Sequence, residues 1–246
     1  MAWHIHPARP PSLGALIYVR PPRSGEETAI ISVVVLAGGP SSRMGKGPKA
    51  LIQLCGRPMI SYVLDVARSL SGDVVVVAGS EEQARALEGA VEGARIIVDE
   101  PDLGPKCPLL GLTTGLKAVK GDVALALACD MPLVSAKVLS FLAEVLSYMN
   151  ATVPRWPNGY VEPLHAAYQV SAALRAGEEL LRAGEPVDMR SFLSTLGRVR
   201  YISTEVLKEL DPALATLMNV NTPTDLRRAE MALRARGLCA GGRKGR

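Results

Sequence analysis

Two glycines follow directly on an apolar, β-branched run near the start of the chain, and basic residues come shortly after them. The run is Ile30–Leu36, the glycines are Gly38 and Gly39, and the basic side chains include Arg43 and Lys49. Glycines after a strand let backbone N–H groups approach an anion closely, and arginine and lysine supply positive charge. These residues suggest a loop that binds phosphates, although two glycines alone are more often a plain turn with solvated basic residues beside it.

Two well-known phosphate-binding loops do not fit this stretch. A Walker loop reads G-x-x-x-x-G-K-[ST]. Here five residues separate Gly39 from Gly45, and Gly47 stands where the Mg²⁺-binding hydroxyl belongs. A G-x-G-x-x-G dinucleotide fingerprint is also absent from the sequence. The loop therefore belongs to neither class.

Two carboxylates stand where later buried strands are expected to end. Asp99 closes Arg95–Val98, and Asp130 follows Val123–Ala128. In open parallel sheets, ligands bind beyond the carboxyl ends of the strands. Asp99 alone is more typical of a helix cap or a turn than of a ligand-binding residue. A charge that emerges directly from a buried strand is costly unless it is paired or bound to metal. Because Mg²⁺ is held by one or two carboxylates plus substrate phosphates, Asp130 is the candidate metal ligand.

Histidine is scarce, which narrows the chemistry. His4 and His6 lie among the first residues, and His165 is the third and last histidine. No Ser/His/Asp or Cys/His set can be assembled, which argues against acyl transfer. A phosphate acceptor needs no such base, because its second pKa of about 6 leaves it mostly dianionic at neutral pH. Nucleotidyl transfer needs positioning, cations on the triphosphate and Mg²⁺ against the charge on the leaving pyrophosphate.

Strands and helices alternate in the part of the chain that must position these residues. Buried strands are expected at Ile30–Leu36, Asp73–Ala78, Arg95–Val98 and Val123–Ala128. Helices are expected from Pro58 to about Leu70, at Glu81–Leu87, from about Leu109 to Val119, and from the cap Ser135 to about Tyr148. Short strands at Ala151–Val153 and Leu164–Gln169, polar helices and a closing amphipathic helix at Thr222–Arg236 follow. The pattern predicts an α/β fold, a doubly wound and mostly parallel sheet with helices on both faces.

One domain accounts for most of the 246 residues, a length that suits a single α/β unit of ordinary size. Residues 29–237 are expected to form this domain. Residues 1–28 are rich in proline and are expected to be a poorly ordered extension, and residues 238–246 a basic flexible tail.

Composition excludes several classes of protein. Hydrophobic residues make up 48% of the chain and charged residues 21%, as in a folded soluble protein. Much of the net charge of +4 comes from the two ends, so we expect no nucleic-acid partner. No apolar run of about 18 residues exists, so we expect no membrane span. The cysteines at 55, 107, 129 and 239 form no C-x-x-C pair, and reduced thiols in a cytoplasmic protein are expected.

These motifs together resemble the nucleotidyltransferase superfamily. LAGGPSSRMG with Lys49 is similar to its signature L-A-G-G-x-S-x-R-M-G-x-x-K. Within the superfamily the chain looks most like the molybdenum cofactor guanylyltransferases. The supporting segments are LIQLCGRPMI, PLLG before a helix, CDMPLV, EPLHAAY, and NVNTP before the last helix. The resemblance covers roughly residues 30–236 in the expected order.

The resemblance implies a Rossmann-like fold and an activity. GMP would pass from GTP to molybdopterin carrying molybdenum, with Mg²⁺ as cofactor, release of pyrophosphate, and transient contacts with other proteins of molybdenum cofactor biosynthesis. The implied nucleotide-binding residues are Leu36, Ala37, Gly38, Gly39, Lys49, Asp99 and Asp130. The implied catalytic residues are Arg43, Lys49 and Asp130, with Asp130 as the metal ligand. Asn219 and Asn221 stand where the family places polar groups near the acceptor or the metal.

Three departures from the family pattern leave alternatives open. Pro48 replaces a common Asp, Cys107 replaces a glycine, and Val77 stands where an Asn is often found. The base could then be cytosine rather than guanine, or the acceptor could differ. Adenosylcobinamide-phosphate guanylyltransferases, molybdopterin cytidylyltransferases and sugar-phosphate nucleotidylyltransferases are the enzyme alternatives. A non-catalytic nucleotide-binding module is the alternative outside enzymes, although such a module should lose Lys49 and Asp130 first.

Overall fold

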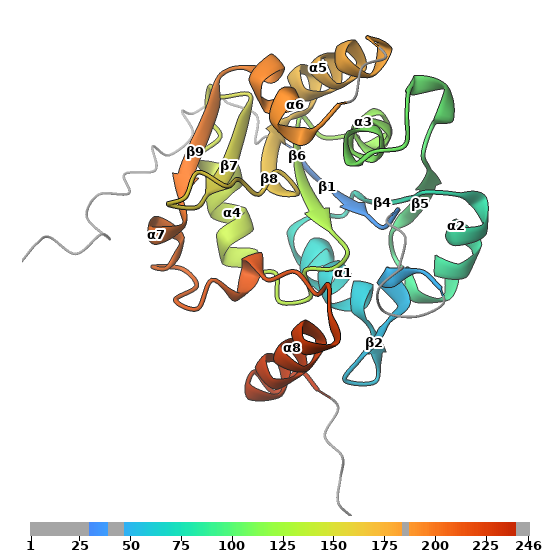
Figure 1. The fold of residues 1–246 in the computed structure, drawn as a ribbon, viewed down its shortest axis with the longest axis vertical. Coiled ribbons are helices and arrows are strands. Elements are labelled where there is room, and N and C mark those ends of the chain that lie inside the picture. Colours follow the sequence, from blue (N-terminus) through green and yellow to red (C-terminus); the bar gives the residue numbers. More distant parts are fainter. Residues whose placement is uncertain (1–29, 39–46, 184–186, 240–246) are drawn as a thin grey trace, which may run out of the picture.

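A mixed β-sheet forms the centre of the protein (Figure 1). A computed structural model of the chain describes residues 30–38, 47–183 and 187–239. Within them the sheet consists of β1 (Ile31–Leu36), β4 (Val74–Ala78), β5 (Arg95–Val98), β6 (Val123–Ala128), β7 (Ala151–Arg155), β8 (His165–Gln169) and β9 (Val199–Ser203). The order across the sheet is β5-β4-β1-β6-β8-β7-β9.

The first half of the sheet is parallel and creates the edge at which a ligand can bind. β1 pairs in parallel with both β4 and β6, and β4 pairs in parallel with β5. β8 runs antiparallel to its neighbours β6 and β7, and β9 is parallel to β7. The residues that follow β1, β4, β5 and β6 therefore meet at one edge, and β8 begins at that same edge.

Helices cover both faces of the sheet, as the alternation of strands and helices predicts. One face carries α1 (Met59–Leu70), α2 (Glu81–Leu87), α4 (Ala136–Glu144) and α7 (Thr204–Leu207). The other face carries α3 (Pro108–Ala118), α5 (Val170–Arg182) and α6 (Met189–Leu196). Successive valines of β1 alternate between the two cores, with Val33 and Val35 on one side and Val34 on the other. This two-sided burial is why the strand reads as a continuous apolar run.

A small outer layer joins segments from opposite ends of the domain (Figure 1). It consists of the hairpin β2 (Gln53–Leu54) and β3 (Arg57–Pro58) together with α8 (Pro223–Ala235). Leu54 and Leu233 are both fully buried in its apolar core. The start of α8 is fixed by a capping box in which Thr222 and Asp225 bind each other's backbone N–H.

A disulfide closes this layer. Cys55 in the hairpin turn is bonded to Cys239 beyond the end of α8, and their Cα atoms are 5.1 Å apart. The expectation of reduced thiols is therefore wrong for these two cysteines, whereas Cys107 and Cys129 are free. The two partners are 184 residues apart in sequence. Only the packing of α8 on the hairpin brings them together, and no sequence spacing reveals that contact.

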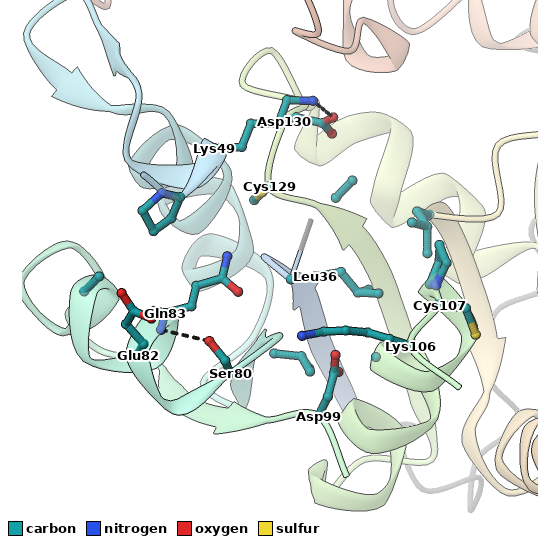
Figure 2. A pocket seen from close by; sticks show the side chains of 18 of the residues that line it. Leu36, Lys49, Ser80, Glu82, Gln83, Asp99, Lys106, Cys107, Cys129 and Asp130 are labelled. Atoms are coloured by element: carbon teal, nitrogen blue, oxygen red, sulfur yellow. Dashed lines mark hydrogen bonds and ion pairs between the residues drawn. The ribbon is translucent and has the colours of Figure 1, made fainter. Parts of the chain in front are cut away.

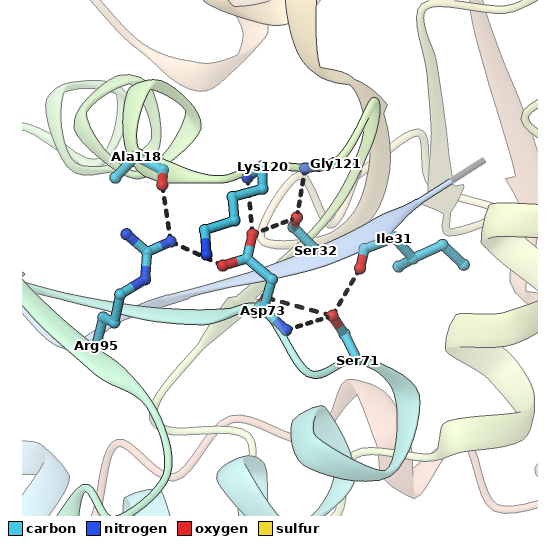
Figure 3. A network of polar contacts seen from close by, with 8 residues as sticks. All are labelled: Ile31, Ser32, Ser71, Asp73, Arg95, Ala118, Lys120 and Gly121. Atoms are coloured by element: carbon cyan, nitrogen blue, oxygen red, sulfur yellow. Dashed lines mark hydrogen bonds and ion pairs between the residues drawn. The ribbon is translucent and has the colours of Figure 1, made fainter.

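A carboxylate holds the starts of the parallel strands at the edge opposite the ligand edge (Figure 3). Asp73, just before β4, accepts hydrogen bonds from the Ser32 hydroxyl at 2.6 Å and from the Lys120 backbone N–H at 2.7 Å. Its other oxygen pairs with Arg95 at 2.7 Å. These bonds lower the pKa of Asp73 although partial burial opposes them. One side chain thus ties together the starts of β1, β4 and β5 and the turn before β6.

The observed elements differ from the expected ones mainly at their ends. α2, β5 and β6 have the expected bounds, whereas α4 ends at Glu144 rather than near Tyr148. Ser135 occupies the N-cap position of α4, but its side chain makes no capping hydrogen bond. Short 3₁₀ helices occur at Lys49–Leu51, Glu88–Ala90, Pro101–Leu103 and Ala215–Leu217. Among the described residues, no helix has the length and apolar character needed to cross a membrane.

Candidate active site

A cleft of about 830 Å³ opens at the ligand edge of the parallel strands (Figure 2). Each of the four strands places a residue there just beyond its end. These residues are Asp99 after β5, Ser80 after β4, Gly38 after β1 and Asp130 after β6. The sheet order puts Asp99 and Asp130 at opposite ends of this row. With neighbouring strands about 4.8 Å apart, the row spans roughly 14 Å.

One end of the cleft holds an ion pair with an amide beside it. Lys49, in the 3₁₀ turn before β2, contacts an oxygen of Asp130 through its ammonium group. The same ammonium group donates to the Asn221 side-chain oxygen at 2.7 Å. The side chains of Lys49 and Asp130 are only 15% and 17% exposed, so water screens their attraction less than at an open surface. Two distant segments, which carry Asp130 and Asn221, therefore converge on one lysine.

Asp130 keeps one oxygen available at this end. Its Oδ2 atom binds Lys49, whereas its Oδ1 atom is buried and has no hydrogen-bond partner among the described residues. A buried carboxylate oxygen without a partner is costly. The arrangement suits a ligand that brings a cation or a donor to Oδ1. No cluster of three or more His, Cys, Asp or Glu side chains with metal-binding geometry occurs in the described part of the chain.

The middle of the cleft is a floor of backbone. A Cβ atom added to Gly79 would lie 2.9 Å from the carbonyl oxygen of Gly38, which leaves no room for a side chain at Gly79, and one added to Gly38 would lie 3.2 Å from the Gly79 nitrogen, a tight contact. Gln83 of α2 fixes this contact. Its amide donates to the Ala37 carbonyl at 2.6 Å and accepts from the Gly79 N–H at 2.8 Å. The ends of β1 and β4 are thereby locked together.

The end opposite Lys49 carries a second pair of opposite charges (Figure 2). Asp99 has a buried Oδ1 atom with no hydrogen-bond partner among the described residues. Burial raises the pKa of Asp99, and the nearby positive charge of Lys106 opposes that rise. The Lys106 ammonium group binds the Gly79 carbonyl and lies next to Asp99 over the cleft floor. Both residues line the cleft.

The side of Asp130 that faces β8 is also acidic. Glu162, in the turn before β8, is half-buried and accepts a hydrogen bond from the Trp156 indole N–H at 2.8 Å. Burial raises the pKa of Glu162, the bond from Trp156 lowers it, and the negative charge of Asp130 raises it further. This carboxylate therefore lies within electrostatic reach of Asp130, beyond the end of the cleft that holds Lys49.

Two potentially reactive side chains near the cleft are held in uncharged forms. His165 is fully buried, and burial lowers its pKa to about 3. Its Nε2 atom lies 3.1 Å from the hydroxyl of Thr216. Burial and the charge of Asp130 raise the pKa of Cys129 to about 12. With a pKa of about 3 the neutral His165 ring is a very weak base, and with a pKa of about 12 Cys129 stays a thiol rather than a nucleophilic thiolate.

The structure brings together most of the residues that the sequence singles out. Leu36 lines the cleft, and Ala37 contributes its backbone carbonyl to the contact with Gln83. Asn219 does not line the cleft, and its amide makes a long contact of 3.5 Å with the Leu217 carbonyl.

Gly39 and Arg43 lie outside the described residues. Their assignment to the phosphates of a nucleotide stays a prediction.

The sequence patterns do not identify two of the cleft residues, Gln83 and Lys106. Ser80 and Gln83 form the pattern S-x-x-Q, which normally indicates a capping box at a helix start. Ser80 does accept from the Gln83 N–H at 3.2 Å, but the Gln83 side chain binds the floor of the cleft instead of the cap. Lys106 lies in a loop rich in proline and glycine, where neither its type nor its spacing distinguishes it from a solvated lysine.

A family model described as the MobA-like NTP transferase domain matches residues 33–199. This match covers well over half of the chain. The chain belongs to the MobA-like NTP transferase family. It is therefore a nucleotidyltransferase, and its doubly wound sheet with helices on both faces is the fold of the family's solved relatives.

Several members of the family resemble this chain over nearly their whole length. The "Probable molybdenum cofactor guanylyltransferase" of Natronomonas pharaonis is 34% identical over 85% of this chain and 99% of its own. The "Molybdenum cofactor guanylyltransferase" of Desulfosudis oleivorans is 32% identical over 83% of this chain and 96% of its own. A solved structure, the "Molybdopterin-guanine dinucleotide biosynthesis protein A" of Archaeoglobus fulgidus, has a TM-score of 0.68 and 30% identity, covering 83% of this chain and 99% of that one.

Proposed function

We propose that this nucleotidyltransferase moves GMP from GTP to molybdopterin, releases pyrophosphate and forms a guanine dinucleotide cofactor. The observation that carries the proposal is the convergence of Lys49, Asp130 and Asn221 at one end of a nucleotide-sized cleft, with an oxygen of Asp130 left without a partner among the described residues. The relatives named molybdenum cofactor guanylyltransferase, and the solved relative named molybdopterin-guanine dinucleotide biosynthesis protein A, support a guanine nucleotide and molybdopterin as the substrates. A cytoplasmic location and transient contacts with other proteins of the pathway belong to the same proposal.

In this proposal the cleft binds the nucleotide along the row of strand ends. The triphosphate lies at the end with Lys49, where the ammonium group attracts its oxygens, and the sugar and base extend past Gly38 toward Asp99. Gly38, which lines this part of the cleft, contributes no side chain that would obstruct a ligand. The length of the row, roughly 14 Å from the strand spacing, suits a nucleoside triphosphate.

The transfer step needs no protein base. The terminal phosphate of molybdopterin, mostly dianionic at neutral pH, attacks the α-phosphorus of GTP. A new P–O–P link forms as the bond from the α-phosphorus to the pyrophosphate oxygen breaks. Lys49 stabilises the negative charge that develops on the triphosphate, and Asn221 and Asp130 hold the lysine in position. His165 and Cys129 are uncharged, which is compatible with a reaction in which the acceptor phosphate is itself the nucleophile.

Asp130 fits Mg²⁺, which we propose as the cofactor. Its buried Oδ1 atom lacks a partner within the described part of the chain, and a single carboxylate completed by substrate phosphates is a common site for this ion. When bound, Mg²⁺ would neutralise part of the charge on the leaving pyrophosphate. Glu162 lies within electrostatic reach of Asp130.

The proposal is tested by pyrophosphate release from GTP, CTP, ATP and UTP, with molybdopterin as acceptor and Mg²⁺ present. We expect release from GTP and its loss on chelation of the metal. Asp130→Asn should lower the rate by about a hundredfold or more, since metal-assisted charge stabilisation contributes several kcal/mol. Asp122→Asn is the matched control, because Asp122 is exposed and lies just before the opposite end of β6, so it should retain the wild-type rate.

Other outcomes of this assay would overturn the proposal in distinct ways. Release from CTP alone would make the protein a cytidylyltransferase. Release from GTP only with adenosylcobinamide phosphate would change the acceptor. Full activity of Asp130→Asn would remove Asp130 as the metal ligand, and silence with every acceptor would indicate a binding module.

A further inference from the structure

Lys106 lies in the cleft at the end away from the proposed triphosphate site. Its ammonium group binds the Gly79 carbonyl, and its Cε atom would lie 3.2 Å from a Cβ atom placed on Gly79. It therefore lies directly over the cleft floor. An ammonium group has three N–H donors, so the bond to Gly79 leaves two of them for a ligand. Figure 2 shows the side chain extended across the cleft toward Asp99.

Asp99 makes this end unsuitable for phosphate. Its Oδ1 atom is buried and unpartnered within the described residues, and the carboxylate would repel an anion. The sheet order separates it from Asp130 by three strand intervals. A ligand here should instead offer hydrogen-bond donors to Asp99 and an acceptor to Lys106. An uncharged heterocycle with both kinds of group meets that requirement.

We propose that Lys106 is a specificity-determining residue that donates to O6 of guanine while Asp99 accepts from N1–H and the 2-amino group. This inference rests on the proposed function, because it assigns the base of the nucleotide that the cleft would bind. Lys106 lies in the loop before α3, and its ammonium group binds the carbonyl oxygen of Gly79, just after β4.

The donor and acceptor pattern of guanine accounts for the selectivity. Along its pairing edge guanine presents one acceptor followed by two adjacent donors. A carboxylate accepts two donors side by side, and an ammonium group needs an acceptor. Adenine and cytosine place an amino group where guanine has O6, and uracil has a single donor between two acceptors. Each of these bases leaves either Lys106 or the partly buried Asp99 without its hydrogen bond, a mismatch that such sites reject.

Equilibrium binding tests this inference without any acceptor. The dissociation constants of GTP, 6-thio-GTP and ITP are measured by calorimetry with Mg²⁺ for the wild type, Lys106→Met and Asp99→Asn. 6-Thio-GTP weakens the acceptor at position 6, and ITP lacks the 2-amino group. The matched control is Lys208→Met, which removes an exposed lysine of the segment after α7 that pairs only locally with Glu205.

We expect Lys106→Met to weaken GTP binding about ten- to a hundredfold, the range for a hydrogen bond to a charged group. The wild-type preference for GTP over 6-thio-GTP should disappear in this variant, and the preference for GTP over ITP should remain. Asp99→Asn should show the opposite pattern. Lys208→Met should match the wild type with all three nucleotides.

Three results would overturn the inference. Lys106→Met could weaken GTP and 6-thio-GTP equally, which would remove O6 as its partner. The same variant could bind inorganic tripolyphosphate more weakly than the wild type does, by the same factor as for GTP. That result would mean that Lys106 contacts the phosphates. The wild type could bind no nucleotide, which would also end the proposed function. The expected binding pattern without transfer to molybdopterin would support the inference and refute the proposed function alone.

Discussion

At the scale of single residues, burial fixes the charge of His165. The imidazole is fully buried where β8 begins, and its Nε2 atom contacts the Thr216 hydroxyl, which also accepts from the Ser135 N–H at 2.9 Å. Its pKa of about 3 means that the folded protein keeps this ring neutral at any ordinary pH. The unfolded chain has no such constraint, so this one side chain makes stability depend on pH.

His165→Gln should reduce the change in the free energy of unfolding between pH 7 and pH 5. The unfolded state takes up a proton below the ordinary histidine pKa of 6.5, whereas the folded state does so only near 3. Stability therefore falls as the pH drops through this window, and the wild type should lose about 2 kcal/mol to this group between pH 7 and 5. Urea unfolding at both pH values measures the loss. An equal loss in the variant would show that His165 titrates normally.

At the scale of elements, the carboxyl ends of the parallel strands carry the chemistry and their starts carry the Asp73 network. Both ends are polar, but their groups differ in how fully they are paired. Both carboxylate oxygens of Asp73 accept hydrogen bonds, whereas Asp99 and Asp130 each have an oxygen with no partner among the described residues. Satisfied polar groups hold strands in place, and unsatisfied ones are available to a ligand.

Asp73→Ala should lower the free energy of unfolding by about 2 to 4 kcal/mol, because it leaves several donors at the strand starts without their acceptor. The lowered pKa of Asp73 adds a pH signature. A carboxylate with a depressed folded pKa stabilises the protein above the unfolded pKa of 3.8, and this contribution is lost as the pH falls through the folded value. Urea unfolding at pH 7 and pH 3 measures both effects.

The control for this variant is Asp65→Ala, which removes an exposed carboxylate paired with Arg57 and Arg68 at the surface of α1. Exposed pairs contribute about 0 to 1 kcal/mol. A similar loss in both variants would mean that the network at the strand starts has no special role.

The elements also show how far sequence patterns reach. Fully apolar runs predict β1, β4 and β6 well, because strands buried on both faces leave no ambiguity about their environment. Strand ends then locate Asp99 and Asp130 at one edge. The edge strand β9 alternates exposed and half-buried residues, and the strands of the β2–β3 hairpin are only two residues long, so neither has a distinctive pattern. The contact between Lys49 and Asn221 joins residues 172 positions apart, and only tertiary packing creates it.

At the scale of the whole molecule, the Cys55–Cys239 disulfide encloses nearly the entire domain in one covalent loop of 184 residues. The loop includes every strand of the seven-stranded sheet except β1. A crosslink over so long a segment restricts the unfolded chain strongly, and the stabilisation grows with the logarithm of loop length. It also holds α8 on the hairpin that follows Lys49, so it supports the segment that carries Asn221.

Reduction of this disulfide should lower the free energy of unfolding by about 3 to 5 kcal/mol. Urea unfolding with and without a reductant measures the change, and Cys239→Ser should reproduce it. Cys107→Ser is the control, because Cys107 is a free thiol. Thiol titration of the denatured protein should find two thiols before reduction, from Cys107 and Cys129, and four after it. Four thiols before reduction would contradict the crosslink.

The backbone floor of the cleft has a consequence for how this enzyme can change over evolutionary time. A Cβ atom on Gly79 would lie 2.9 Å from the Gly38 carbonyl oxygen, so a larger residue there would force the backbone apart, and a Cβ atom on Gly38 would make a tight contact of 3.2 Å with the Gly79 nitrogen. Among the described residues, new base preferences must arise at the rims, from the loop around Lys106 and from the exposed face of α2. When libraries of variants of this enzyme are selected for use of another nucleotide, the substitutions should therefore occur at the rims of the cleft, and both glycines should remain unchanged.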